Sequence, residues 1–345
     1  PHQDVGWVRK RTLELYAKHY TLSWPQEEHN SARPLRRSPL YQRLLDRGAC
    51  FGEKLGWERP NWFAPPGITP KDVYSFGRPG WFESVGAEHR AVRGRVGIFD
   101  QSSFAKFLIV GRDACQALNW LCANNVDQPV GKLIYTQLCN DRGGVECDLT
   151  VARLAEERFY LVTGTGFATH DKHWIERNLP AGVDAHLVDV TSANAVLCVH
   201  GPLARELLKR LCPHDLGNAS FPFGTAQHVT IAGAPLWALR VTYVGELGWE
   251  LHVPVEFALG LYDALTAAGQ ELGAVDAGYR AIESLRLEKG YRAWARELTA
   301  STTPLEAGLG WAVKLKTDVD FLGREALLAQ KQRGLTRRLI GVTVD

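Results

Sequence analysis

The 345-residue chain contains no methionine, and its apolar runs all fall short of the length that crosses a membrane. A transmembrane helix needs about 20 consecutive apolar residues, so we expect neither a membrane span nor a membrane partner. The GxGxxG and Walker phosphate-binding loops are also missing, and so is the GxSxG nucleophile elbow. These absences argue against dinucleotide binding, nucleoside triphosphate hydrolysis and serine-hydrolase chemistry within this chain. For the lack of methionine we have no physical explanation.

An excess of charge of either sign is lacking as well. The 40 basic and 38 acidic residues leave a net charge of +2. A nucleic-acid groove needs a concentrated basic face, so no nucleic-acid partner is expected. Hydrophobic residues make up 45% and charged residues 23% of the chain, which is typical of a folded globular protein. The length allows two or three domains, each with its own core.

The seven cysteines form no CxxC pair, and their number is odd. Most of them lie inside apolar stretches, as is typical of buried, reduced thiols. The first residues, PHQDVGWVRKR, have no apolar core of the signal-peptide kind. We therefore predict a cytoplasmic location, or the mitochondrial matrix if the source is eukaryotic.

The first 75 residues differ in character from the rest. A helix is predicted from Val5 to Lys18, and loops rich in proline and arginine follow it. The segment GEKLGWERPNWFAPPG, from Gly52 to Gly67, then gathers tryptophan, proline and glycine. Large aromatic side chains are costly to leave in water. We expect this segment to pack against something larger, either the domain that follows or one outside the chain.

From about Gly77 a similar order of elements occurs twice. The first pass predicts a helix at 113–123, a hairpin at 133–151, a strand at 159–163 and a helix at 168–179. The second predicts a helix at 202–212, a strand at 227–231, a hairpin at 236–253 and a helix at 255–268. The repetition favours an α+β fold of two pseudo-repeated modules with antiparallel sheets and a cleft between them, where ligands often bind. Further helices are expected within 276–294, ending at Gly290, and at 323–332.

Each predicted hairpin carries a carboxylate inside its returning strand: Asp148 in YTQLCNDRGGVECDL and Glu250 in VTYVGELGWEL. The glycine-bearing loops NDRGG and GELG suit strand reversals. Side chains alternate along a strand, so Asp148 shares a face with Glu146 and Thr150, and Glu250 shares one with His252. Aspartate is depleted in strands. A strand carboxylate among apolar neighbours therefore indicates either a bonded partner or a functional role.

Other reactive side chains receive structural interpretations. His170 and His173 form an HxxH pair in a polar helix, but further ligands are lacking, so we predict no metal site and a solvent-facing pair. His200 ends an apolar strand and is expected to be a structural histidine. Cys147 alternates to the face opposite Asp148, so it is expected to pack in the core rather than act as a nucleophile.

Several segments, in the same order, resemble one family: YTQLCNDRGGVECDL, RVTYVGELGWELHVP, and YRAIESLRLEKGYRAW followed by TPLEAGLGWAV. They are similar to the folate-binding part of dimethylglycine and sarcosine dehydrogenases, and to the aminomethyltransferase (T-protein) of the glycine cleavage system. This likeness runs from about Arg78 to the end. RPLRRSPLYQRLLDRGACFGEKLGWERPNWFAP is similar to the stretch that joins the flavin and folate halves of those dehydrogenases.

The resemblance implies a division of the chain. Residues 1–75 would be the linker or tail of an oxidoreductase central domain. Residues 76–333 would be an aminomethyltransferase-like folate-binding domain with modules at about 76–195 and 196–333, and 334–345 the start of a truncated C-terminal β-barrel, with RRLIGVTVD as a strand. The flavin fingerprint of such dehydrogenases is absent. FAD would therefore come only from a missing domain or a partner subunit.

The resemblance also implies roles for individual side chains. T-proteins often carry two adjacent acids where this chain has Cys147 and Asp148, and the second acid is retained. Asp148 would lie beside the reacting nitrogens of tetrahydrofolate as the catalytic residue. Glu250 would hold the pterin edge through two hydrogen bonds. Arg280 would orient the folate or its carboxylate neighbours.

Three aromatic residues, Tyr135, Tyr243 and Trp294, would pack the ring system, with plain core packing as the alternative. The implied function is tetrahydrofolate-dependent one-carbon transfer. The iminium or formaldehyde from an N-methylamine of the dimethylglycine or sarcosine type would be captured as 5,10-methylenetetrahydrofolate. Two alternatives stay open: an aminomethyl-, O-methyl- or S-methyltransferase using another donor, and a non-catalytic folate-binding or scaffold protein. A flavin oxidoreductase acting alone is disfavoured by the missing fingerprint.

Overall fold

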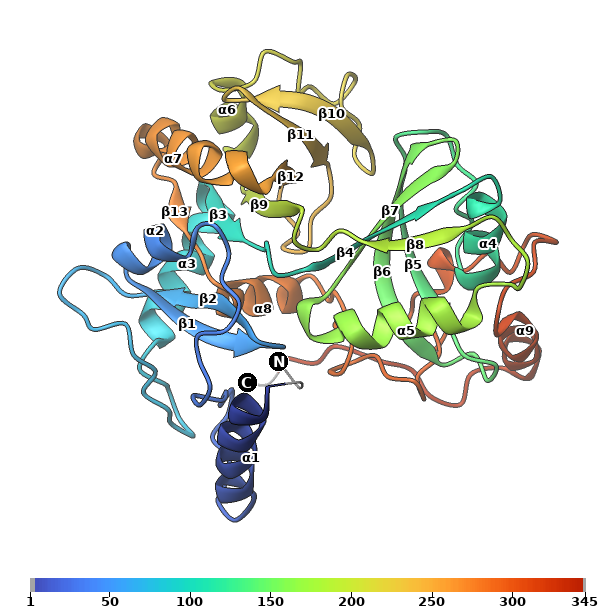
Figure 1. Cartoon of the computed structure of the whole chain (residues 1–345), viewed down its shortest axis with the longest axis horizontal. Coiled ribbons are helices and arrows are strands. Elements are labelled where there is room, and N and C mark those ends of the chain that lie inside the picture. Colours follow the sequence, from blue (N-terminus) through green and yellow to red (C-terminus); the bar gives the residue numbers. More distant parts are fainter. Residues whose placement is uncertain (1–3, 344–345) are drawn as a thin grey trace.

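The computed structural model describes residues 4–343, which form two large sheets with helices on their faces and a smaller N-terminal part (Figure 1). One sheet has five antiparallel strands in the order β5-β6-β7-β4-β8. The other has six strands in the order β10-β11-β12-β9-β3-β13, of which only the last pair, β3 and β13, is parallel. The predicted α+β fold with antiparallel sheets is confirmed.

The N-terminal part consists of helices and one hairpin: α1 (Val5–His19), α2 (Tyr41–Asp46), β1 (Ala49–Lys54), β2 (Trp57–Phe63) and α3 (Phe82–Gly94). Helix α1 extends away from the rest of the molecule (Figure 1). The hairpin packs inward, because Trp62 is buried against Cys50 and Trp81. The Trp-rich segment thus does pack against the following domain, which was one of the two expectations.

The five-stranded sheet is built from β4 (Ala105–Val110), β5 (Leu133–Cys139), β6 (Val145–Ala155), β7 (Arg158–Thr163) and β8 (His186–Asp189). Helices α4 (Ala114–Leu121) and α5 (Ala168–Asn178) contribute to its core. That core includes Phe107, Leu118, Cys147 and Ile175, all essentially inaccessible. The assignment of Cys147 to core packing is confirmed.

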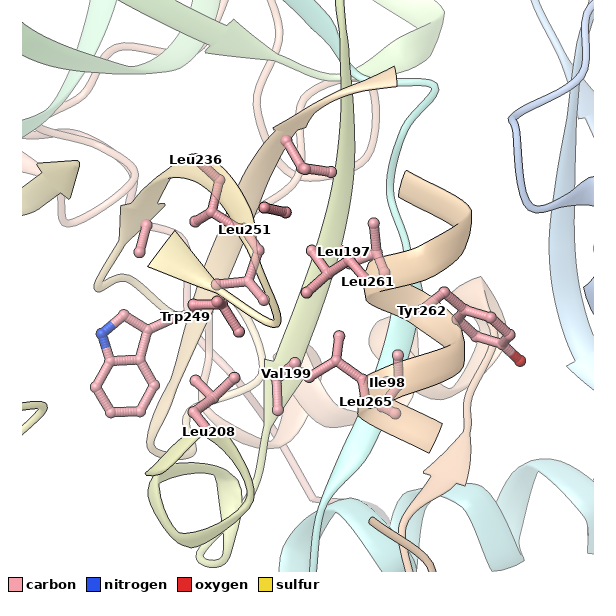
Figure 2. Packing of buried hydrophobic residues seen from close by; sticks show 14 of the residues in the cluster. Ile98, Leu197, Val199, Leu208, Leu236, Trp249, Leu251, Leu261, Tyr262 and Leu265 are labelled. Atoms are coloured by element: carbon pink, nitrogen blue, oxygen red, sulfur yellow. The ribbon is translucent and has the colours of Figure 1, made fainter. Parts of the chain in front are cut away.

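The six-stranded sheet is built from β3 (Gly97–Asp100), β9 (Asn194–His200), β10 (Ala226–Ile231), β11 (Ala234–Leu239), β12 (Gly248–Pro254) and β13 (Val275–Asp276), with helices α6 (Ala204–Lys209), α7 (Ala258–Gly269) and α8 (Tyr279–Glu288). Figure 2 shows Trp249 and Leu251 of β12 in the cluster that also contains Leu261 and Leu265 of α7. Burying each such side chain contributes about 1.5–3 kcal/mol. Trp249 and Leu251 thus form the face of β12 that packs in this core, and Glu250 and His252 lie on the other face, as alternation along a strand requires.

Two details of the second hairpin differ from the prediction. Residues 240–247 form an irregular loop instead of a strand with a tight turn, and β11 pairs with β12 over only three residue pairs. Tyr243 alternates with Val241 as in a strand, yet its hydroxyl donates to the carbonyl of Arg292 at 2.8 Å. This tertiary contact, together with Gly245 at φ +78°, keeps the segment out of the sheet.

The C-terminal residues also differ from the prediction. Helix α9 (Arg324–Arg333) forms as expected, but residues 334–343 have no regular secondary structure. The predicted strand in RRLIGVTVD is therefore wrong for residues 337–343, while 344 and 345 lie outside the described residues. The backbone N–H of Leu339 donates to the carbonyl of Glu306 at 2.9 Å instead of joining a ladder. No closed barrel is found among residues 4–343.

The sheets interleave along the chain. Strand β3 precedes the whole five-stranded sheet but belongs to the six-stranded one. Phe321 and Leu327 follow the six-stranded sheet in the chain. They nevertheless pack against Ala123 and Cys139, which belong to the part of the chain that forms the five-stranded sheet. The division of the domain near residue 195 thus stays a prediction.

Candidate functional site

The turn before β6 fixes the position of Asp148. The side-chain oxygen of Asn140 accepts the backbone N–H groups of Arg142 (3.1 Å) and Gly144 (2.9 Å), and its amide donates to the carbonyl of Ala300 (3.0 Å). A Cβ at Gly144 would lie 1.9 Å from that same carbonyl oxygen, so only glycine fits there. The predicted NDRGG turn therefore also anchors the hairpin to residues far along the chain.

Asp148 lies in β6 on the face predicted for it, directly opposite Gln137 of β5. The Nε2 amide of Gln137 donates to Oδ1 of Asp148 at 3.0 Å. Burial raises the pKa of Asp148 to about 6, although Tyr135 and Gln137 act to lower it. No ion pair joins Asp148 to a cationic side chain within residues 4–343. The carboxylate is thus held by neutral groups, and its protonation changes near neutral pH.

Two of the predicted aromatic residues lie close to Asp148. Its charge helps, after burial, to raise the pKa of both the Tyr135 and the Tyr243 phenols. Tyr135 comes from the five-stranded sheet, whereas Tyr243 packs against the core under the six-stranded sheet. Trp311 stacks on Tyr135 with ring centroids 5.8 Å apart and is 71% exposed. The site of Asp148 therefore borders both sheets and is lined by aromatic rings.

Glu250 lies in β12 opposite Cys198 of β9, with its side chain 12% exposed. Its Oε2 is 3.3 Å from Nε2 of His252, which shares its face as predicted. Nδ1 of His252 is in turn 3.1 Å from the hydroxyl of Tyr160, which belongs to β7 of the other sheet. Glu250 of the six-stranded sheet is therefore linked through His252 to Tyr160 of the five-stranded sheet.

The two carboxylates have different neighbours. Among residues 4–343 no hydrogen bond joins Asp148 to Glu250, and their nearest partners, Gln137 and His252, lie on different strands. Tyr243 lies in the field of Asp148 and packs against the hydrophobic cluster that contains Cys198, the strand partner of Glu250. A cavity of about 160 Å³ has His252 and Tyr160 in its wall, but neither Asp148 nor Glu250.

Arg280 occupies a different environment from the one expected. Its two terminal nitrogens donate to both oxygens of Asp72, at 2.6 and 2.8 Å, and its guanidinium lies 3.5 Å from the ring centroid of Trp81. The indole N–H of Trp62 donates to the same carboxylate at 2.8 Å. These contacts fasten the loop that carries Asp72 to α8. A role for Arg280 toward folate stays a prediction, and the described contacts give it a structural partner.

Trp294 lies at the edge of the five-stranded sheet. Its indole N–H donates to the carbonyl of Val145 at 2.9 Å, and its ring packs edge-on against Phe167 and beside His170. The side chain thus stabilises the start of β6, three residues before Asp148. Packing of Trp294 against a bound ring stays a prediction.

The helix that carries His170 also brings together Cys147, His170 and Asp171, with one potential ligand atom of each within 4.8 Å. Protein groups already engage Asp171: the Thr163 hydroxyl donates to it at 2.5 Å, and His170 lies 3.0 Å away. Burial, followed by the charge of Asp171, raises the pKa of the Cys147 thiol well above its usual range. The cluster is therefore explained without a metal ion.

Three residues near the site were not singled out from the sequence. Gln137 could have been found from the hairpin register, because it stands directly opposite Asp148. Trp311 and Arg286 gave no local signal. Arg286 is completely buried, forms ion pairs with Glu283 and Glu297, and lowers the pKa of Tyr243. Only the tertiary fold brings these two toward the aromatic residues beside Asp148.

Two mainly antiparallel sheets with helices on their faces form a fold of the aminomethyltransferase class. Comparison with known proteins agrees. Residues 40–317 match the family model described as GCVT N-terminal domain, and residues 1–38 match that of the FAD dependent oxidoreductase central domain. The chain belongs to the GCVT family.

Individual proteins give the same result. The chain is 39% identical to human mitochondrial sarcosine dehydrogenase and 40% identical to mouse mitochondrial dimethylglycine dehydrogenase. Each alignment covers 98% of this chain but only 41% and 39% of the respective relative. The crystal structure of glycine cleavage system aminomethyltransferase T from Bartonella henselae matches with a TM-score of 0.73 at 28% identity, covering 87% of this chain and 76% of that one. The resemblance inferred from the motifs is confirmed.

Proposed function

We propose that this domain binds tetrahydrofolate at the junction of the two sheets and catalyses one-carbon transfer to it, with Asp148 as the catalytic residue. One observation carries the proposal: Asp148 is a half-buried strand carboxylate with no ion-pair partner among residues 4–343, and desolvation raises its pKa to about 6. Keeping such a group in a strand costs stability. That cost has an explanation if the carboxylate takes part in the reaction.

The residues around Asp148 fit a reduced folate. Oε1 of Gln137 is buried and has no hydrogen-bond partner among the described residues, although Nε2 of the same amide is bonded to Asp148. An amide oxygen and a carboxylate side by side present acceptors to a ligand that carries N–H groups. Tyr135, Tyr243 and the exposed Trp311 add aromatic surface against which a flat ring can pack. Glu250 would supply a further acceptor for the pterin edge.

Bound tetrahydrofolate supplies two nitrogens that can hold a one-carbon unit between them. Asp148 is mostly ionised at pH 7.5, because its pKa is about 6. It can then accept the proton that a nitrogen loses on forming a bond, and its negative charge stabilises a nearby cationic centre.

The test is Asp148→Asn, which keeps the size of the side chain and its contact with Gln137. Formation of 5,10-methylenetetrahydrofolate from tetrahydrofolate and formaldehyde is followed, and the uncatalysed rate is subtracted. We expect a loss of about 10²- to 10⁴-fold with folate binding retained. Glu146→Gln, on the same strand and face, is the matched control and should keep its activity. Unchanged product formation in Asp148→Asn would refute the catalytic role.

Placement of the pterin is tested separately by calorimetric titration with tetrahydrofolate. The parent chain should bind it, and Glu250→Ala should bind more weakly. Equal binding by both would place the pterin elsewhere. Binding without any product formation in the parent would favour the alternative of a non-catalytic folate-binding protein, and product formed only from another donor would favour a different methyl or aminomethyl transferase.

A flavin-containing domain or subunit is proposed as the partner that oxidises an N-methylamine of the dimethylglycine or sarcosine type. Support comes from α1, which lies in the part matching the FAD dependent oxidoreductase central domain. Its Val5 and Tyr16 are 81% and 64% exposed, and Arg11 is its only buried residue. The two dehydrogenase relatives are named as mitochondrial, so the mitochondrial matrix is proposed for a eukaryotic source. Among the described residues, no helix is long and apolar enough to cross a bilayer.

A further inference from the structure

The carboxylate of Glu250 is held by a chain of hydrogen bonds that crosses from one sheet to the other. His252 follows two residues later on the same face of β12, and its Nε2 lies 3.3 Å from Oε2 of Glu250. Nδ1 of the same ring lies 3.1 Å from the hydroxyl of Tyr160 in β7. His252 and Tyr160 are both buried, with ring centroids 5.3 Å apart in an edge-on arrangement.

Chemistry fixes the direction of these hydrogen bonds. An ionised carboxylate can only accept, so Nε2 of His252 must carry the proton. Burial lowers the pKa of His252, and the nearby charge of Lys106 lowers it further against the opposing effect of Glu250. The ring is therefore neutral, and Nδ1 is an acceptor. Tyr160 then donates, which agrees with the burial that raises the pKa of its phenol.

A cavity and the ammonium group of Lys106 lie beside this chain of hydrogen bonds. Tyr160 and His252 form part of the wall of the 160 Å³ cavity, together with Leu108 and Leu154 from one sheet and Trp237 from the other. Lys106 acts on the pKa of His252, but its ammonium group donates to the carbonyls of Ser102 (2.8 Å) and Asn194 (2.7 Å). It is therefore not available to replace the imidazole at Glu250.

We propose that Tyr160 and His252 are positioning residues that make Glu250 a directed acceptor for an N–H group of the ligand. Oε2 is bonded to His252, whereas no hydrogen bond to Oε1 is found among residues 4–343. Oε1 is thus the oxygen offered to the ligand, and the five-stranded sheet sets its direction through Tyr160. This inference rests on the proposed function, and it assigns the recognition of a reduced pterin to residues from both sheets.

The first test needs no ligand. The chain is labelled with ¹⁵N-histidine, and the His252 signals are identified by their loss in His252→Gln. At pH 7 we expect a neutral ring protonated at Nε2. Tyr160→Phe should move the Nδ1 resonance, because that nitrogen loses its donor. Tyr262→Phe is the matched control. The Tyr262 hydroxyl is buried like that of Tyr160, but it donates to Asp276 at 3.0 Å. Its removal should leave the signals of His252 unchanged. A ring protonated at Nδ1 would overturn the inference.

The second test is titration with tetrahydrofolate. Tyr160→Phe and His252→Leu should each weaken binding about three- to tenfold, the range expected for one hydrogen bond. His252→Gln keeps an N–H donor at a similar reach and should recover part of the loss, and Tyr262→Phe should bind like the parent.

The outcomes separate the two proposals. If Glu250→Ala weakens binding while Tyr160→Phe and His252→Leu do not, the positioning role is wrong and the proposed function stands. If Glu250→Ala binds as tightly as the parent, the placement of the pterin is wrong, and the tautomer of His252 still decides whether the hydrogen-bond chain exists.

Discussion

Asp148 and Asp72 are both largely buried carboxylates, yet their surroundings shift their pKa values in opposite directions. Asp72 is bonded by both terminal nitrogens of Arg280 and by the indole N–H of Trp62. These contacts outweigh burial and hold the pKa of Asp72 below its usual range. Asp148 receives hydrogen bonding only from neutral groups, and burial raises its pKa to about 6.

The comparison separates stability from function. A buried carboxylate that is fully paired is needed by its partner, because removing it leaves an uncompensated buried charge, and it has no capacity left for a ligand. One that keeps its charge without a cation costs folding free energy and retains strong affinity for a donor or proton. From the sequence, Arg280 looked like a site residue because it resembles an arginine of the family. The contacts show that it is paired with Asp72, and its role toward folate stays a prediction.

The largest expected effect on stability comes from breaking the paired carboxylate. Asp72→Asn leaves the guanidinium of Arg280 buried without its counter-charge, and we expect a loss of about 3 kcal/mol in the free energy of unfolding. Urea unfolding at pH 7 measures it. The loss should shrink as the pH falls through the folded pKa of Asp72, because a lowered carboxyl pKa stabilises the fold only while the group is ionised.

Asp263→Asn is the matched control. Arg43 contacts Asp263 through the same fork geometry, at 3.2 and 3.1 Å, but both side chains are about half exposed. Exposed pairs contribute little, so this change should leave the unfolding midpoint nearly unchanged. Equal losses in the two variants would mean that burial of the Asp72 pair does not matter.

The opposite sign is expected for the unpaired carboxylate. Asp148→Asn should stabilise the fold at pH 8 by up to about 3 kcal/mol, which corresponds to a pKa raised from 3.8 to about 6. A raised pKa means that the parent loses stability as the pH rises from about 4 through 6. The gain of the variant should therefore vanish below about pH 4. Urea unfolding across this range checks it.

Asp141→Asn, in the exposed turn of the same hairpin, serves as the control and should change little. A destabilised Asp148→Asn at pH 8 would show that the carboxylate contributes to folding in the way Asp72 does. The proposed difference between Asp148 and Asp72 in their contribution to stability would then be wrong.

Local patterns predict the parts of the site that depend on neighbours in the sequence. Side chains alternate along a strand with a period of two. This alternation predicted that Asp148 and Cys147 lie on opposite faces of β6, and that Glu250 and His252 share a face of β12. The NDRGG turn was also predictable from local sequence, because Asn140 accepts hydrogen bonds from backbone N–H groups only two and four residues away. Such features are set by backbone geometry before any tertiary contact forms.

Contacts between distant residues could not be predicted in this way. Asp72 and Arg280 are 208 positions apart, and Tyr160 and His252 are 92 apart. The loop at 240–247 illustrates the resulting error. Its alternating Val241 and Tyr243 favour a strand, but the bond from Tyr243 to the carbonyl of Arg292 outweighs that local preference.

The smallest expected effect refines the surroundings of Asp148. Tyr135 lowers the pKa of that carboxyl, so Tyr135→Phe should raise it further while the ring still stacks on Trp311. A proton acceptor with a higher pKa is ionised over a narrower range of pH, so the acid limb of the activity profile should move upward. The rate near pH 6 should fall about two- to fivefold, in line with one lost hydrogen bond, and the rate at pH 8.5 should hardly change.

Tyr291→Phe is the control, because Tyr291 stacks on Tyr243 without acting on the pKa of Asp148. A uniform drop at every pH would mean that Tyr135 serves binding of the ring, while a shift confined to the acid limb would place its hydroxyl among the neutral groups that set the charge of Asp148.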